Sequence, residues 1–398
     1  MNRIANIIGF YLPAKFQRWF IYLPIDLTAC AAILVAVLCL KASFIHGDPF
    51  FQVGVLTQDA DLQLRHLHSV LQKSASTGHL NIMEGYSQLC GYSSEWDACF
   101  YAFYCMTLRE LAKISPERIE NIRLDMNLCA RGILRVPPTV SDSELGSYFA
   151  KRSYGKSVIH GGYVGIVLGT RKLVVKDTLF DIAMMKNAEE LAIYLLQCLD
   201  HADEFWSSDH ATQLYAVWLY DQATGKGHER LFRCWGNVMK KRFLEKKTGL
   251  LYSEMGVNPD KILSEPRGSS IGWTALFLVD VLPEFARDLY DKLCAYRERR
   301  FFNFEGTAEF TSRSLFQFGD TDSGPLIFGI SPSATGEAFC CHKLFGDKAR
   351  FTRILRVFEV FGDSYRDKDR MFYRHANALG DVILLYAKIC PVKKRGPL

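Results

Sequence analysis

Apolar positions recur with the period of an α-helix along most of the chain beyond residue 95. In residues 96–112, WDACFYAFYCMTLRELA, they dominate one face, and Pro116 then opens the next helix at its first turn. Alternating runs of Val, Ile and Thr with hairpin turns are absent from the sequence, so we expect an all-α chain without an extensive sheet. The helical period recurs at about residues 163–175, 188–199, 210–223, 228–243, 273–279, 283–299, 335–344, 349–361 and 376–389.

The predicted helices come in pairs. Their links alternate between short turns and longer loops rich in Gly, Asp and Ser. A toroid of helical hairpins has this pattern, with an inner ring, an outer ring and loops at one end that form a bowl. We therefore expect an (α/α)6 toroid over residues 76–390, with its functional site in the long loops.

An apolar stretch near the N-terminus departs from this pattern. Residues 27–40, LTACAAILVAVLCL, carry no charge, and if Lys41 extends its amine towards water, the apolar segment runs to Ile45, about the span of a bilayer. Arg3, Lys15 and Arg18 precede it, which places the N-terminus in the cytoplasm. We predict a cytoplasmic segment over 1–26, a single transmembrane anchor over 27–45, a linker over 46–75, the barrel on the extracytoplasmic side, and a basic tail over 391–398.

Three alternatives compete with an anchor for this stretch. A cleaved signal peptide needs small residues beyond the apolar core, and residues 38–41, LCLK, do not supply them. The tetrapeptide LTAC at 27–30 resembles a lipoprotein cleavage box, but its apolar run follows the cysteine. A buried core helix is the third alternative, because the uncharged run ends after 14 residues.

Charge and cysteine spacing limit the partners. The net charge of +5 comes from 48 basic and 43 acidic side chains, and the basic ones are scattered, so we expect no nucleic-acid partner. The 12 cysteines show no paired CxxC spacing, and the chain has no GxSxG, HExxH or phosphate-binding glycine loop, so we expect no metal and no cofactor. So many cysteines are unusual in an exported domain, where they would pair or oxidise.

Five segments resemble a known family in the same order and at similar spacing. They are CFYAF at 99–103, GGYVGIVLGTRKLV at 161–174, DHATQLYAVWLYD at 209–221, WTALFLVDVLPEFARDLYDKL at 273–293, and EGTAEF with GDTDSG at 305–324. The family is linalool dehydratase/isomerase, and the resemblance runs over about residues 95–390. It implies an (α/α)6 barrel, and it implies acid–base chemistry that interconverts terpenoid alcohols and alkenes in a closed cavity.

Two positions depart from that family's pattern. Asp209 aligns with a cavity cysteine, and Tyr163 aligns with a histidine, so a carboxyl and a phenol stand in place of a thiol and an imidazole. Asp320 and Asp322 match paired acids near the end of the family's barrel. The resemblance therefore implies a polar cavity whose chemistry depends on carboxylates.

The residues themselves indicate three catalytic aspartates. Asp209, in FWSSDHATQ, opens a predicted inner helix, where it is either an N-cap or a carboxyl that faces the bowl. Asp320 and Asp322 alternate around Thr321, so on an extended loop both point the same way, and repulsion would hold one proton between them. The alternative for this pair is an Asx turn with a helix cap.

Six further residues are predicted to bind substrate. The acids among them fall in loops beside aromatic residues, and the aromatic residues would form an apolar or sugar-stacking wall. The alternative is that the aromatic residues belong to the core, which is the commoner role at helical spacing. The six are Tyr163, Trp206, His210, Glu254, Trp273 and Glu309.

Three functions remain open. The first is a membrane-anchored hydro-lyase or isomerase acting on an isoprenoid-like alcohol, as the resemblance implies. The second is a hydrolase or lyase acting on a glycan, because helical toroids also host enzymes that use paired carboxylates with an aromatic wall. The third is a non-catalytic binding or scaffold protein of the cell envelope. An open polar bowl favours catalysis or ligand binding, and a bowl filled by side chains favours a scaffold.

Overall fold

The chain forms two units, Met1–His46 and Gly47–Leu398. The computed structural model describes residues 30–52, 54–78, 80, 95–135, 158–201, 204–257, 260–311 and 319–393. The predicted cytoplasmic segment, 1–26, and most of the predicted basic tail lie outside these residues.

The N-terminal unit contains an apolar helix. The segment Cys30–Phe51, which begins in this unit and ends in the second one, is long and apolar enough to cross a membrane. Its side chains Ile33, Leu34, Val37 and Leu40 are exposed. A membrane span and a signal sequence both have these properties, so the anchor over 27–45 and its topology stay predictions.

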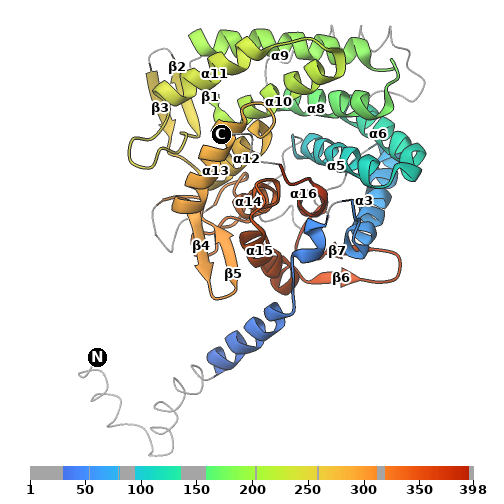
Figure 1. Ribbon diagram of the computed structural model, residues 1–398, viewed down its shortest axis with the longest axis vertical. Coiled ribbons are helices and arrows are strands. Elements are labelled where there is room, and N and C mark those ends of the chain that lie inside the picture. Colours follow the sequence, from blue (N-terminus) through green and yellow to red (C-terminus); the bar gives the residue numbers. More distant parts are fainter. Residues whose placement is uncertain are drawn as a thin grey trace, which may run out of the picture. The chain divides into compact units, whose positions relative to one another are not determined.

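The second unit is an (α/α)6 toroid. Six inner helices of the described chain pack side by side in a closed ring, in which the last helix returns to the first. Figure 1 shows this ring, with α14, α16 and α5 near the centre of the view. The inner helices are α5 (Glu95–Ile114), α8 (Val158–Val175), α10 (Ser207–Thr224), α12 (Gly268–Leu278), α14 (Pro332–Leu344) and α16 (Ala378–Ile389).

An outer layer of helices covers the ring, and the chain alternates between the two layers. The sequence explains which helix lies where. Inner α12, GSSIGWTALFL, is apolar or small on every side and is buried throughout, whereas outer α11, ERLFRCWGNVMKKR, has one apolar face. The outer helices are α3 (Gln58–Thr77), α6 (Ile119–Leu134), α9 (Asp181–His201), α11 (Glu229–Arg242), α13 (Pro283–Arg297) and α15 (Lys348–Phe361).

The links follow the predicted alternation with one exception. Each link from an inner to an outer helix is a short turn, as at η2 (Pro116–Arg118), and the links back to the inner helices are longer, except that residues 202–206 alone join α9 to α10. Small antiparallel sheets lie in the links back to the inner helices. Their strands are β1 (Phe205–Trp206), β2 (Glu254–Val257) and β3 (Asp260–Ser264), β4 (Glu298–Phe301) with β5 (Phe304–Thr307), and β6 (Ser364–Arg366) with β7 (Met371–Tyr373). The first sheet combines β1 from the α9–α10 link with β2 and β3 from the α11–α12 link.

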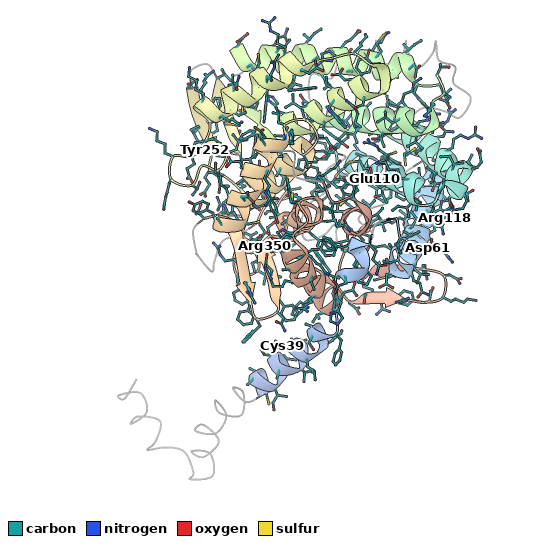
Figure 2. All side chains as sticks on the ribbon, viewed as in Figure 1. Cys39, Asp61, Glu110, Arg118, Tyr252 and Arg350 are labelled. Carbon is teal, nitrogen blue, oxygen red and sulfur yellow. The ribbon has the colours of Figure 1, made fainter. Side chains whose placement is uncertain are left out.

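The toroid begins earlier than the expected residue 76. A 3₁₀ turn, η1 (Asp48–Phe51), contacts α15, and α3 packs on α16 and α6. The segment 46–75, expected as a linker, therefore contains an outer helix, because Leu62, Leu67 and Leu71 are buried on one side of a mostly polar sequence. Asp61 of α3 pairs with Arg118 at 2.5 Å, and both residues are labelled in Figure 2.

Candidate active site

A cavity of about 730 Å³ opens at one end of the ring. It is lined by residues from the first two turns of all six inner helices, together with parts of the long links. The N-terminal ends of these helices, with their partial positive charge and free backbone N–H groups, therefore converge on one space. The bowl predicted from the sequence is open, and polar and aromatic side chains line it.

Asp209 lies in the first turn of α10 and lines this cavity. The helix start is fixed by the small sheet before it, where Phe205 pairs with Met255, and by the backbone bond from Ser207 to the carbonyl of Ser253 at 2.9 Å. The N-cap is Trp206, so Asp209 does not occupy the cap position. Its carboxylate instead accepts a hydrogen bond from the Ser208 hydroxyl at 3.3 Å.

The surroundings of Asp209 favour its neutral form. Burial raises the pKa of Asp209 from 3.8 to about 7, and the nearby charges of Glu95 and Asp322 add to the shift. A carboxyl that holds a proton near neutral pH can act as a general acid. The same electrostatic coupling shows that three carboxyl groups, from α5, α10 and the loop before α14, share the cavity.

The two aspartates of GDTDSGP have different environments. Asp320 forms an Asx turn, in which its Oδ1 accepts the backbone N–H groups of Asp322 at 3.1 Å and Ser323 at 2.8 Å. It does not line the cavity. The turn directs Asp322 to the cavity instead, where partial burial and the charge of Asp320 raise its pKa. The expectation that both acids face one site was wrong, because the loop is a turn and not extended.

Arg267 is a buried cation in the cavity wall. Its guanidinium donates to Glu309 at 2.7 Å and to Asp320 at 2.8 Å, so each acid fixes one side of it. Glu309 also accepts from the hydroxyl of Ser269 at 2.6 Å and from its backbone N–H at 3.2 Å, at the start of α12. Glu309, expected to bind substrate, does not line the cavity and instead holds Arg267 and the helix start in place.

Glu337 in α14 adds a deeply buried carboxyl to the cavity wall. Burial raises its pKa well above the usual value, although a hydrogen bond from Ser333 at 2.9 Å opposes the shift. Its Oε2 has no hydrogen-bond partner among the described residues. A neutral carboxyl in this position can donate a hydrogen bond to a ligand oxygen.

His210 lines the cavity but cannot act as a base. Its Nδ1 accepts from the indole N–H of Trp235 at 3.1 Å, so the neutral ring carries its proton on Nε2. Burial lowers the pKa of His210 to about 3, and the ring stacks on Phe205 with 4.4 Å between centroids. His210 is therefore a neutral hydrogen-bond donor at the cavity wall.

Aromatic residues form much of the remaining wall. Trp206, Tyr163 and Trp273 line the cavity, and the Trp273 indole donates to Thr212 at 3.0 Å. Burial raises the pKa of Tyr163 well above its usual value, so the phenol keeps its proton. Glu254 pairs with Trp206 in the small sheet but does not line the cavity.

Sequence reasoning missed four charged residues of this wall, which are Glu95, Glu204, Arg267 and Glu337. None belongs to a motif. All four lie in the first two turns of inner helices or up to three residues before them, the same region in which Asp209 lies. Ranking every ionisable residue by its place at an inner-helix start would have found them.

Comparisons with known proteins give distant structural similarity alone. No family model matches the chain, and no curated protein matches it. An α-1,6-mannanase GH76A from a Salegentibacter species is similar with a TM-score of 0.48 and 12% identity, over 82% of this chain and 98% of that one. An inactive variant of it, in complex with α-1,6-mannotriose, has a TM-score of 0.47 and 11% identity over 82% and 99%. A GH76 α-mannanase from Bacteroides thetaiotaomicron has a TM-score of 0.46 and 9% identity over 83% and 97%.

The resemblance to linalool dehydratase/isomerase is wrong. The structures found to be similar are α-mannanases, and neither a family model nor a curated protein supports the terpenoid family. Four of the five segments that carried the resemblance lie mostly within the helices α5, α8, α10, α12 and α13, where a helical toroid requires small and apolar residues whatever its chemistry. The toroid expected from the resemblance is nevertheless present.

Proposed function

We propose that this chain is a glycoside hydrolase whose catalytic carboxyls are Asp209 and Asp322. The observation that carries the proposal is that these two acids line one open cavity, where the charge of Asp322 helps to raise the pKa of Asp209. Glycosidic bonds are cleaved by such pairs, in which one carboxyl is neutral and the other is ionised.

The surroundings of Asp209 and Asp322 suggest which carboxyl is the general acid and which is the base or nucleophile. Asp209 keeps a proton to about pH 7 and would deliver it to the glycosidic oxygen as the bond to carbon breaks. Burial and Asp320 raise the pKa of Asp322, but Arg267 opposes the shift. The side chain is exposed at the cavity mouth, so Asp322 would be the acid of the pair that ionises and serves as the base or nucleophile. A water molecule supplies the hydroxyl to one product and returns the proton to the pair.

The rest of the wall suits a sugar. Trp206 presents a ring face beside the Arg267 guanidinium, 5.9 Å from the ring centroid, and sugar rings stack on such surfaces. His210 and the neutral Glu337 add polar groups just behind the cavity surface, where His210 Nε2 and Glu337 Oε2 are buried and have no hydrogen-bond partner among the described residues. A cavity of about 730 Å³ lies within the range of small-molecule sites, about 300–1,000 Å³.

The test is hydrolysis of a glycan panel by the purified full-length chain, with products measured by mass spectrometry. The panel includes envelope glycans and α-1,6-linked manno-oligosaccharides, the ligand class seen in one similar structure. We expect turnover that falls by about 10²–10⁴-fold in both Asp209→Asn and Asp322→Asn. Asp291→Asn is the matched control, because Asp291 forms an exposed pair with Arg287 on the outer helix α13.

Two outcomes would change the conclusion. Glycan binding that persists unchanged in both variants, without turnover by the wild type, favours the binding protein. Hydrolysis by the wild type that survives both substitutions shows that other residues carry the chemistry.

We also propose that the N-terminal apolar helix anchors the toroid outside the cytoplasm. Its length and composition support this placement. A reporter fused after residue 60 tests it, and reporter activity confined to the cytoplasm would refute the orientation.

A further inference from the structure

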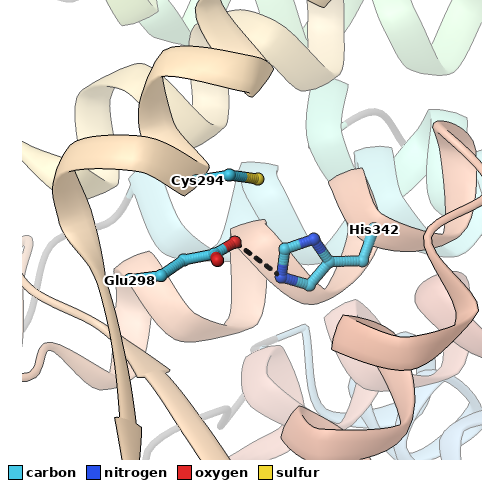
Figure 3. Close-up of side chains that lie close together, drawn as sticks. All are labelled: Cys294, Glu298 and His342. Atoms are coloured by element: carbon cyan, nitrogen blue, oxygen red, sulfur yellow. Dashed lines mark ion pairs between the residues drawn. The ribbon is translucent and has the colours of Figure 1, made fainter.

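A second group of reactive side chains lies away from the cavity, where α13, the β4–β5 hairpin and α14 meet. Cys294 and Glu298 are four residues apart at the end of α13 and the start of β4, so they fall on one face. His342 comes from the last turn of α14, and Figure 3 shows its ring facing the Glu298 carboxylate, with the Cys294 thiol on the same side as Glu298. Glu305 of β5 points to the same place, because alternate residues of the hairpin share a face. None of the four lines the cavity.

Three ligand-type atoms of this group face one another without hydrogen bonds, whereas the Cys294 thiol hydrogen-bonds to Glu298. His342 Nε2 lies 3.5 Å from Glu298 Oε1 and 3.7 Å from Glu305 Oε1. Within the described part of the chain, each of these three atoms is buried and has no hydrogen-bond partner. Cys294 Sγ completes the group, and one ligand atom each from Cys294, Glu298 and His342 lies within 4.8 Å of the others.

The surrounding residues orient these ligands. Arg350, labelled in Figure 2, donates to Glu298 Oε2 at 2.5 Å. Arg353 binds Oε2 of Glu305, so each carboxylate keeps only its Oε1 for the shared space. The Tyr290 hydroxyl lies 3.0 Å from His342 Nδ1, which leaves Nε2 as the free ring nitrogen. Such outer contacts are typical of metal-ligating carboxylates and histidines.

We propose that Cys294, Glu298, Glu305 and His342 form a closed zinc site that ties the β4–β5 hairpin to α14. Zinc binds thiolate, imidazole and carboxylate ligands tetrahedrally, at about 2.3 Å for sulfur and about 2.0–2.2 Å for nitrogen and oxygen. Neighbouring ligand atoms of such a site are therefore about 3.3–3.7 Å apart. The two measured separations from His342 agree with these edges. The Cys294 thiol, within 4.8 Å of Glu298 and His342, would move closer as zinc binds, and Glu305 would add the fourth ligand that makes the site structural.

Charge also fits a divalent cation. The thiolate and two carboxylates carry three negative charges, and Arg350 and Arg353 each take one outer oxygen of a carboxylate. Binding of Zn²⁺ displaces the thiol proton of Cys294 to solvent, and the imidazole keeps its other proton towards Tyr290. The sequence shows no CxxC spacing at this site, because its ligands come from four elements over 49 residues of chain, from 294 to 342.

The test uses the purified full-length chain after dialysis against a chelator. Zinc is added back and measured by mass spectrometry, and cobalt is added to a second sample. We expect about one zinc ion per chain, and a cobalt spectrum with tetrahedral d–d bands and a thiolate charge-transfer band. Cys294→Ser should remove the charge-transfer band and weaken zinc binding by more than about 100-fold, and Tyr290→Phe should weaken it by about 10–100-fold.

Cys234→Ser is the control, because Cys234 is an exposed thiol of α11. Zinc binding in this variant should equal that of the wild type. Glu305→Gln removes a ligand charge at almost constant volume, so it serves as a second variant if Cys294→Ser folds poorly. A wild-type chain that holds no zinc after reconstitution, or zinc and cobalt signals that Cys294→Ser and Glu305→Gln leave unchanged, would overturn the proposal.

Discussion

Replacing Asp209 by Asn should make the protein more stable at alkaline pH while it removes activity. The folded chain holds a proton on Asp209 up to about pH 7, whereas the unfolded chain releases it near the usual pKa of 3.8. Between these values the folded state binds more protons than the unfolded state, so the free energy of unfolding falls as pH rises. The substitution Asp209→Asn abolishes this loss, because the amide of asparagine does not titrate.

The size of this stability difference follows from the pKa shift of Asp209. A pKa change from 3.8 to about 7 corresponds to at most about 4 kcal/mol, at 1.36 kcal/mol per pH unit. Because Asp209 is only half-buried beside an open cavity, water reduces this to roughly 2 kcal/mol. Most of the effect accumulates between about pH 4 and 7, so from pH 5 to pH 8 the wild type should lose about 1–2 kcal/mol relative to Asp209→Asn.

Urea unfolding followed by circular dichroism at pH 5 and pH 8 measures this difference. The buried carboxyl Asp381, whose pKa burial raises to about 8, changes both proteins equally and cancels. Asp291→Asn should show no pH-dependent difference from the wild type. An equal stability difference between wild type and Asp209→Asn at the two pH values would show that the Asp209 carboxyl is already ionised in the cavity.

Three further substitutions test the support of the site. Arg267→Met should destabilise the fold by about 3–5 kcal/mol in urea unfolding, because it leaves the Glu309 carboxylate buried and unpaired, and the double variant with Glu309→Gln should recover part of the loss. Trp235→Phe should cost about 2–4 kcal/mol, because it removes the bond to His210 and leaves a void where the fully buried indole packs, without a change in the pH–activity profile, since His210 is a neutral donor. Gly165→Ala should lower stability by about 1–3 kcal/mol in thermal unfolding, because its Cβ would lie 2.6 Å from a side-chain carbon of α10.

The sequence predicted the toroid well, because helical period and loop length determine it. The inner helices show apolar or small residues on all sides, and the alternation of short and long links follows directly from the ring. It missed α3, whose buried leucines are separated by polar residues that lie on the solvent side. The mostly polar composition of this 20-residue helix gave no sign of its apolar face, which becomes evident from its packing against α16 and α6.

The site was harder to predict, because side-chain direction depends on local backbone geometry. Asp320 and Asp322 look equivalent in sequence, yet an Asx turn separates them into a support for Arg267 and a cavity acid. Glu309 lies beside an aromatic residue as expected, but it faces the buried Arg267 behind the wall. Such side-chain directions depend on contacts between segments that are far apart in the sequence, and the spacing of residues along the chain does not predict these contacts.

The closure of the ring has a consequence for synthesis. The Gln63 amide donates to the backbone carbonyl of Asp381, 318 residues further along the chain, and α16 is the inner helix that joins α14 to α5. At about 5–20 residues per second, roughly 16–64 s pass between the synthesis of these two partners. Until α16 is made, the ring stays open, and the apolar surfaces of α14 and α5 that α16 covers remain exposed. The need of the nascent chain for chaperones should therefore end only when α16, the last inner helix, is complete.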